Sequence, residues 1–193
     1  MLNLFSIGVE KYNIELNNDE LIAHCKENYT PGDKWLNFDK PVLDELKSTF
    51  LQQGKEFLKQ LYGTEKEPIL KIDRIWGNAK IDEEILMPHT HKTSLLSSVY
   101  YLTPGKLSFL NPFHVTLAHV DQDDVEVYNE YNSDRGFIEM DKSDMVIFNS
   151  QIYHFAAFTN NERISIACDM SLELAKRRVE IIPRPLANET IGW

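Results

Sequence analysis

The N-terminal part of the chain has hydrophobic positions spaced for a short strand region followed by helices. Apolar and polar residues alternate over residues 4–17, which predicts one or two strands, and Asn17 or Asn18 can cap a helix that follows. From Pro41 to Tyr62 apolar residues recur every three or four positions, which predicts a long amphipathic helix ended by Gly63. We expect these helices to form a layer that covers a sheet.

After Pro68 the pattern changes to short runs of β-branched, aromatic and other apolar residues. Proline, glycine, asparagine and aspartate separate the runs, as is typical of strands joined by turns. The runs cover residues 69–81, 94–102, 106–112, 114–120, 125–132, 136–150 and 163–174. Many short strands after a helical segment predict a β-rich α+β fold built on a β-sandwich or barrel.

The length of the chain, 193 residues, suits a single domain. Within it we expect residues 1–67 to give helical and strand support, residues 68–175 to form the β-rich core, and residues 176–193 to be a C-terminal extension. An exposed edge strand could pair two copies into a homodimer.

Charge and cysteine content limit the expected binding partners and the expected cellular location. The formal net charge of −10 opposes binding to nucleic acid and to anionic lipid. No run of about 18 apolar residues is present, so no membrane helix is expected. The first residues lack positive charge and carry acids early, unlike a secretory signal. Cys25 and Cys168 form no disulfide framework, and a reducing cytoplasm is the expected location.

Histidines supply the candidate chemistry of the β-rich part. His89 and His91 are two residues apart, so on a strand both side chains would point to one face and could converge on one ion. His154 and Arg163 belong to successive strand-like runs, a spacing that allows a hairpin with both in one cavity. A buried imidazole beside a guanidinium is favourable when the imidazole is neutral and the arginine faces an anion. A bound metal and a carboxylate ligand would meet these two conditions.

A plainer interpretation of these residues stays open at this point. A lone histidine in a strand is most often structural, and Arg163 could pair with Glu162 or Asp169. His114 and His119 are five residues apart, so they would face opposite sides of a strand and could not share an ion.

Four ordered motifs carry a resemblance to a known family. They read HTH at 89–91, VYYL at 99–102, PGKLSF at 104–109 and His-x8-Arg-x-Ser from His154, with RIWGN before them. This set resembles the iron(II)- and 2-oxoglutarate-dependent dioxygenases, in particular small oxygenase-like proteins of phages and marine bacteria. The resemblance implies a double-stranded β-helix (a jelly-roll or cupin-like core) with an N-terminal helical layer. It also implies Fe(II) as cofactor, and 2-oxoglutarate and O2 as cosubstrates.

The resemblance further implies roles for seven residues. The metal ligands would be His89, His91 and His154. The 2-oxoglutarate site would be formed by Arg163, which pairs with the distal carboxylate, by Ser165 on the same strand face, and by Tyr101 and Leu107. The implied reaction is hydroxylase-type, with oxidative decarboxylation of 2-oxoglutarate coupled to oxidation of a substrate C–H bond.

Two positions depart from the pattern of the family. PGKL at 104–107 replaces the common Gly-Gly start, which matters little, and the second departure is at position 91. His91 stands where most members have Asp or Glu. A three-histidine set keeps the geometry but makes the metal centre one charge more positive, and it would also accept zinc, nickel or copper. Two alternatives therefore remain: a cupin-like three-histidine metalloenzyme that does not use 2-oxoglutarate, and a non-catalytic jelly-roll module. The primary substrate stays open, and its binding loops are expected within residues 78–88 and 113–140.

Overall fold

The computed structural model describes residues 8–28, 39–80, 87–112, 133, 135–156 and 162–173. Within them lie helices α1 (Asn18–Asn28) and α2 (Asp44–Tyr62), the 3-10 helix η1 (Pro41–Leu43), and strands β1 (Val9–Asn13), β2 (Leu70–Lys80), β3 (Leu96–Tyr101), β4 (Gly105–Leu110), β5 (Arg135–Met140), β6 (Asp144–Asn149), β7 (His154–Ala156) and β8 (Arg163–Leu172). The strands predicted over 114–120 and 125–132, the histidines His114 and His119, and the C-terminal extension lie outside the described residues.

The two N-terminal helices confirm the hydrophobic pattern. Helix α1 begins directly after Asn17, whose side-chain oxygen accepts a hydrogen bond from the backbone N–H of Glu20 at 3.5 Å. The long helix differs from the prediction only in its first turn, which from Pro41 is 3-10 rather than α. Gly63 ends α2 with a left-handed φ of 57°, and its N–H donates to the carbonyl of Gln60 at 3.2 Å.

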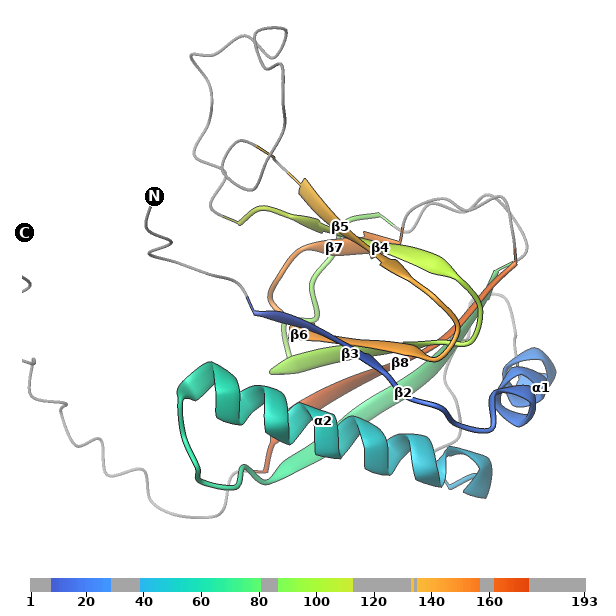
Figure 1. Ribbon diagram of the computed structural model, residues 1–193, viewed down its shortest axis with the longest axis horizontal. Coiled ribbons are helices and arrows are strands. Elements are labelled where there is room, and N and C mark those ends of the chain that lie inside the picture. Colours follow the sequence, from blue (N-terminus) through green and yellow to red (C-terminus); the bar gives the residue numbers. More distant parts are fainter. Residues whose placement is uncertain are drawn as a thin grey trace, which may run out of the picture.

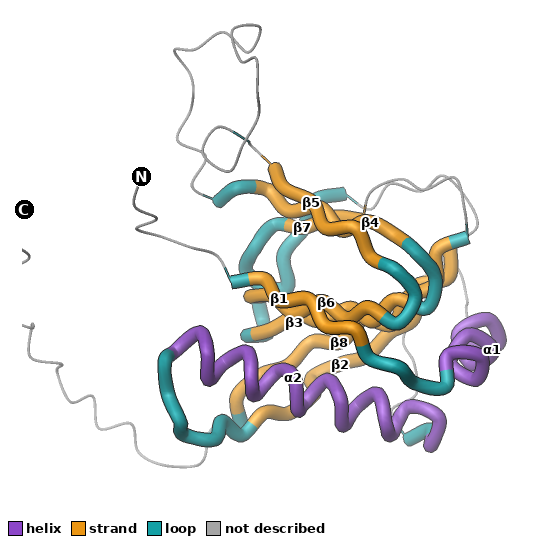
Figure 2. The backbone as a smooth tube through the Cα atoms, viewed as in Figure 1, coloured by secondary structure: helices purple, strands orange, loops and turns teal. Residues whose placement is uncertain are grey.

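The strands form two antiparallel sheets. Among the described residues, β1, β6, β3, β8 and β2 form a five-stranded sheet in that order, and β5, β4 and β7 form a three-stranded sheet. Figure 1 shows the two sheets facing each other, and Figure 2 shows α2 on the outer side of the larger sheet. This arrangement is the predicted double-stranded β-helix with a helical layer.

One face of the five-stranded sheet packs against the helices. On β8 the residues of this face are Ile164, Ile166, Cys168 and Met170, each 0% exposed. They belong to one apolar cluster with Phe50 of α2. Because successive side chains of a strand point to opposite faces, every second residue of β8 joins this core.

The other face of the same strand is polar. Arg163, Ser165 and Asp169 are 7%, 3% and 0% exposed. Arg163 and Ser165 line a cavity between the two sheets, together with Leu107 of β4. A second apolar cluster, which contains Leu107 and Tyr101, packs beside this cavity. A single strand therefore contributes to the hydrophobic core with one face and to the candidate site with the other.

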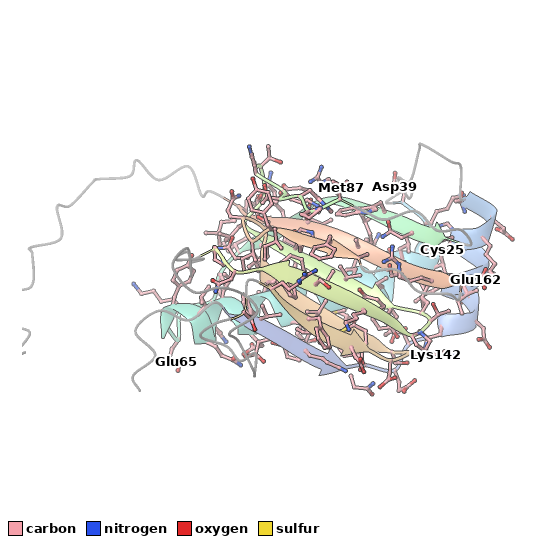
Figure 3. The ribbon with its side chains drawn as sticks, turned by 90° about the horizontal axis from the view of Figure 1, so that it is seen from above. Cys25, Asp39, Glu65, Met87, Lys142 and Glu162 are labelled. Atoms are coloured by element: carbon pink, nitrogen blue, oxygen red, sulfur yellow. The ribbon has the colours of Figure 1, made fainter. Side chains whose placement is uncertain are left out.

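Helix α1 lies at one end of the larger sheet, near the start of β8. Figure 3 shows Glu162 beside the helix that carries Cys25, and Lys26 of this helix forms an ion pair with Glu162 at 3.1 Å. Cys25 and Cys168 are buried free thiols, as the sequence predicted. In the part of the chain that the structure describes, no helix is long and apolar enough to cross a membrane.

Candidate metal centre

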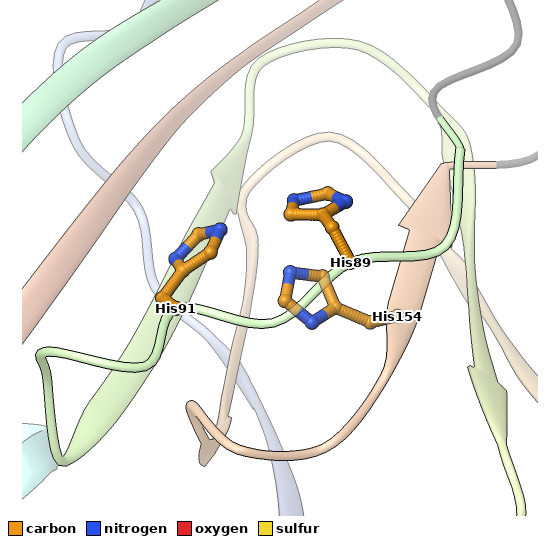
Figure 4. Close-up of side chains that lie close together, drawn as sticks. All are labelled: His89, His91 and His154. Atoms are coloured by element: carbon orange, nitrogen blue, oxygen red, sulfur yellow. The ribbon is translucent and has the colours of Figure 1, made fainter.

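Three histidine side chains gather at the cavity between the sheets. His89, His91 and His154 offer ligand nitrogens that all lie within 4.8 Å of one another. The ring centroids of His89 and His154 are 4.5 Å apart, and the His91 ring lies 5.0 Å from each of the other two. Figure 4 shows His154 on β7 and the other two on the segment before β3. His91 and His154 are buried and His89 is half-buried.

Backbone hydrogen bonds hold this arrangement. His89 and His154 form an isolated antiparallel bridge, in which each N–H donates to the carbonyl of the other at 3.0 Å. The N–H of His91 donates to the carbonyl of Ser150 at 2.9 Å. The HTH motif therefore lies outside the described strands, and its two imidazoles converge because β7 and the turn at Ser150 hold the segment in place.

Backbone carbonyls accept hydrogen bonds from the same ring nitrogen, Nδ1, of two of the histidines. Nδ1 of His89 lies 2.8 Å from the carbonyl oxygen of Met87, and Nδ1 of His154 lies 2.9 Å from that of Ile152. Since a carbonyl oxygen only accepts, each Nδ1 carries a proton, and in the neutral imidazole the lone pair is then on Nε2. Burial lowers the pKa of His154 to about 4, which keeps this imidazole neutral at pH 7.

Asp169 orients the third histidine, a role that the sequence did not reveal. Nδ1 of His91 donates to Oδ1 of Asp169 at 2.7 Å, and the hydroxyl of Ser97 donates to the same oxygen at 2.7 Å. Nε of Arg74 donates to Oδ2. Ser97 and Arg74 lie directly opposite Asp169 on the two neighbouring strands, β3 and β2.

The carboxylate of Asp169 is thus charged although it is buried. Burial alone would raise the pKa of Asp169, but hydrogen bonds from His91, Ser97 and Arg74 lower it below its ordinary value. With Oδ1 as acceptor, the proton of His91 stays on Nδ1, so all three histidines present Nε2.

Trp76 packs against both His91 and Arg74, two of the residues that donate hydrogen bonds to Asp169. Its ring centroid lies 5.4 Å from that of His91, and the guanidinium of Arg74 lies 5.4 Å from a Trp76 ring centroid. Trp76 and Asn78 both line the cavity, and Arg74 precedes them by the same two-residue step on β2. The RIWGN motif therefore turns its alternate residues toward the site, a periodicity that could have indicated Arg74 from the sequence.

Arg163 lies in another part of the cavity wall. It is 7% exposed, and its Nε has no hydrogen-bond partner. Glu162 and Asp169, the acids considered from the sequence, form their ion pairs with other residues. Burial raises the pKa of the neighbouring Tyr101 to about 12, so this phenol keeps its proton. Because a buried guanidinium is unfavourable without a counter-charge, the position suits an anionic ligand.

All seven residues selected from the sequence line one cavity. Its wall contains His89, His91, His154, Tyr101, Leu107, Arg163 and Ser165, with Trp76, Asn78, Ser97, Val99, Phe148 and Ala156 among the others. The expected hairpin between His154 and Arg163 is wrong, because β7 pairs with β4 while β8 pairs with β2 and β3. The two residues reach the cavity from different sheets.

Gly105 makes room for the ring of Tyr101. A Cβ at this position would lie 2.7 Å from Cε1 of Tyr101 and 3.4 Å from Cδ of Arg163. The ring is buried and cannot move aside freely, so a side chain here would shift it. The glycine of the PGKLSF motif is therefore a packing requirement of the cavity wall.

A comparison with known protein families identifies the family of this chain. Residues 74–169, about half of the chain, match the family described as "Putative 2OG-Fe(II) oxygenase". The match begins at Arg74, ends at Asp169 and includes the four motifs. The chain belongs to this family, whose name states iron(II) as the metal and 2-oxoglutarate (2OG) as the cosubstrate. No curated protein matches it in sequence.

Solved structures share the fold. A prolyl-4-hydroxylase from Pseudomonas putida is 15% identical, with a TM-score of 0.57 over 86% of this chain and 88% of that one. The non-heme alpha-ketoglutarate-dependent epimerase SnoN from nogalamycin biosynthesis is 12% identical, with a TM-score of 0.58 over 85% and 77%. HygX from Streptomyces hygroscopicus, with nickel and 2-oxoglutarate bound, is 11% identical, with a TM-score of 0.55 over 87% and 83%. At these identities the likeness supports the fold alone.

The residues around the cavity fit the metal and the cosubstrate in the family name. Three imidazoles whose ligand nitrogens lie within 4.8 Å of one another are suitable donors for iron(II), and also for zinc, nickel and copper. Arg163 offers a cation for a dicarboxylate in the same cavity. The triad therefore constitutes a possible metal site.

Proposed function

We propose that the protein is an Fe(II)- and 2-oxoglutarate-dependent oxygenase of the hydroxylase type. Its metal ligands would be Nε2 of His89, His91 and His154. The observation that supports this proposal most strongly is that the three histidines offer ligand nitrogens within 4.8 Å of one another at one cavity, while every Nδ1 of the triad lies beside an acceptor. Iron(II) and 2-oxoglutarate would supply oxidation of a substrate C–H bond coupled to decarboxylation of 2-oxoglutarate to succinate.

Arg163 would bind the distal carboxylate of 2-oxoglutarate. A guanidinium can donate two parallel hydrogen bonds to a carboxylate, and these are strongest where water is excluded. Ser165 follows on the same face of β8 and is 3% exposed, so its hydroxyl can donate to the same group. Tyr101 would donate its phenol proton to the cosubstrate, since its raised pKa keeps that proton in place.

The apolar part of the wall would exclude water from the reaction. Leu107 is 3% exposed and Phe148 is 0% exposed, and the ring of Phe148 lies 4.6 Å from that of His154. These side chains would keep the histidines neutral and the cosubstrate in one orientation.

An anaerobic titration of Fe(II)-loaded protein with 2-oxoglutarate tests the proposal. The iron–cosubstrate chelate should give a weak visible charge-transfer band in the wild-type protein. Arg163→Ala should weaken the binding of 2-oxoglutarate by about 30-fold or more, because it removes a buried charge partner, while the metal remains bound. His154→Ala should lose the metal.

Two other outcomes of this titration would contradict the proposal, and each would favour a different alternative. If the metal binds but no band forms, the cupin-like three-histidine enzyme becomes the better interpretation. If no metal binds to the wild-type protein, the histidines are structural and the protein is a non-catalytic jelly-roll module.

A further inference from the structure

We infer that Asp169 supplies, through His91, the negative charge that a three-histidine centre lacks among its direct ligands. This inference rests on the proposed function, since it takes the triad as the metal site. Asp169 would then be a positioning residue, which acts on the ion through an imidazole and does not touch it.

The three histidines differ in what their Nδ1 atoms meet. His89 and His154 face neutral backbone carbonyls, whereas His91 faces a carboxylate. A carboxylate acceptor fixes the tautomer of a ligating imidazole and raises its basicity more than a carbonyl does. His91 is therefore the histidine with the most anionic partner.

The net charge around the ion follows from this contact. Three neutral imidazoles would leave a divalent ion at +2, whereas two imidazoles and a carboxylate would leave it at +1. The carboxylate of Asp169 is 0% exposed, so water screens its field weakly. Counting Asp169 behind His91 restores the sum to +1, so the acid absent from position 91 is replaced by one on β8.

The positive charge of Arg74 reduces the effect of the Asp169 charge on the metal ion. It donates to Oδ2, whereas His91 occupies Oδ1, so the two partners lie on different oxygens of Asp169. The side chain of Arg74 is 33% exposed, and solvent screens its charge more than that of the buried carboxylate. Removing the anion and removing its outer cation should therefore change the metal centre in opposite directions.

Metal affinity distinguishes this electrostatic role from a purely structural one. Mn(II) is titrated into the full-length protein and into Asp169→Asn, Arg74→Gln and Ser97→Ala. We expect Asp169→Asn to bind Mn(II) about 10- to 100-fold more weakly, as is usual for loss of an outer partner of a ligating histidine. Arg74→Gln should bind about two- to fivefold more tightly. Ser97→Ala removes a neutral donor to the same oxygen and keeps the charge of Asp169, so it should weaken Mn(II) binding less than Asp169→Asn does.

The Fe(III)/Fe(II) midpoint potential provides a second readout. Loss of the anion should raise the potential in Asp169→Asn, and loss of the cation should lower it in Arg74→Gln. Equal Mn(II) affinity of Asp169→Asn and wild type would overturn the inference, as would a weaker affinity in Arg74→Gln. If Asp169→Asn does not fold, the sign of the Arg74→Gln effect decides. Failure of the wild-type protein to bind Mn(II) would instead refute the metal site itself.

Discussion

The two faces of strand β8 are equally buried but differ in chemistry. Toward the helices lie Ile166, Cys168 and their apolar neighbours, and toward the smaller sheet lie Arg163, Ser165 and Asp169. Asp169 accepts hydrogen bonds from three donors, whereas Nε of Arg163 has no acceptor. The comparison shows that burial alone does not separate apolar packing from buried polar groups, and the buried guanidinium of Arg163 is where we propose that an anionic ligand binds.

Because the two faces differ in chemistry, we expect one face of β8 to determine the stability of the protein and the other to determine its binding of ligands. The helix-facing side contributes apolar area and should determine the free energy of unfolding. The cavity-facing side contributes donors and charges and should determine the affinity for metal and cosubstrate.

The largest effect on stability is expected from the helix side. Phe50 of α2 is 0% exposed, and Phe50→Ala should lower the free energy of unfolding by about 3–5 kcal/mol, because it leaves a cavity in the apolar cluster. Chemical denaturation measures this change. The Mn(II) affinity of the folded fraction should remain that of wild type, and a parallel loss of affinity would show that the two faces are not separable.

Metal binding on one face should protect thiols on the other. Burial raises the pKa of Cys25 to about 12 and that of Cys168 well above its ordinary value, so both thiols should react only when the fold opens. Free Mn(II) at 100 times its Kd should stabilise the protein by about 2.7 kcal/mol and slow thiol labelling about 100-fold. His154→Ala is the control, and Mn(II) should leave its labelling rate unchanged.

A smaller effect is expected where the cavity wall requires a glycine. Gly105→Ala should displace the ring of Tyr101, cost about 1–3 kcal/mol of stability and weaken the binding of 2-oxoglutarate. Gly136→Ala on β5 is the matched control, since a Cβ there meets nothing within 4 Å. Equal behaviour of the two variants in denaturation and in titration with 2-oxoglutarate would argue against the role given to Gly105.

The smallest effect is expected at the surface contact between α1 and the start of β8. Lys26 and Glu162 pair at 3.1 Å with side chains 51% and 38% exposed, so solvent screens the pair. Lys26→Met should change the free energy of unfolding by less than about 1 kcal/mol and leave metal affinity unaltered. A larger change in a thermal melt would mean that this contact positions β8 and its polar face.

Much of the fold could be predicted because local pattern and tertiary environment agree. The apolar spacing from Pro41 to Tyr62 and the glycine at position 63 suffice to define α2. The strands from residue 69 onward are short apolar runs bounded by turn residues, and most of the described ones occur where the pattern indicated. The exceptions are β7 (His154–Ala156), which lies outside the predicted runs, and the run at 136–150, which forms two strands, β5 and β6. The division into 1–67, 68–175 and 176–193 and a homodimer stay predictions.

The residues selected from the sequence lie together in the structure, but the contacts between them were less predictable. The motifs located seven of the residues that line the cavity, whereas the partner of His91 lies 78 positions away in the chain. That contact exists because the register of β8 sets Asp169 between Ser97 and Arg74, and no local pattern specifies a register between distant strands. The pairing of β7 with β4 was missed for the same reason, since sequence proximity favoured a hairpin with β8.

The most direct test of the central claim is an anaerobic crystal structure of the protein with Fe(II) and 2-oxoglutarate. We expect the ion at about 2.0–2.2 Å from Nε2 of His89, His91 and His154, with Nδ1 of His91 still bonded to Asp169. We also expect the distal carboxylate of 2-oxoglutarate on Arg163. An ion bound elsewhere, or one bound by Asp169 in place of His91, would contradict the account.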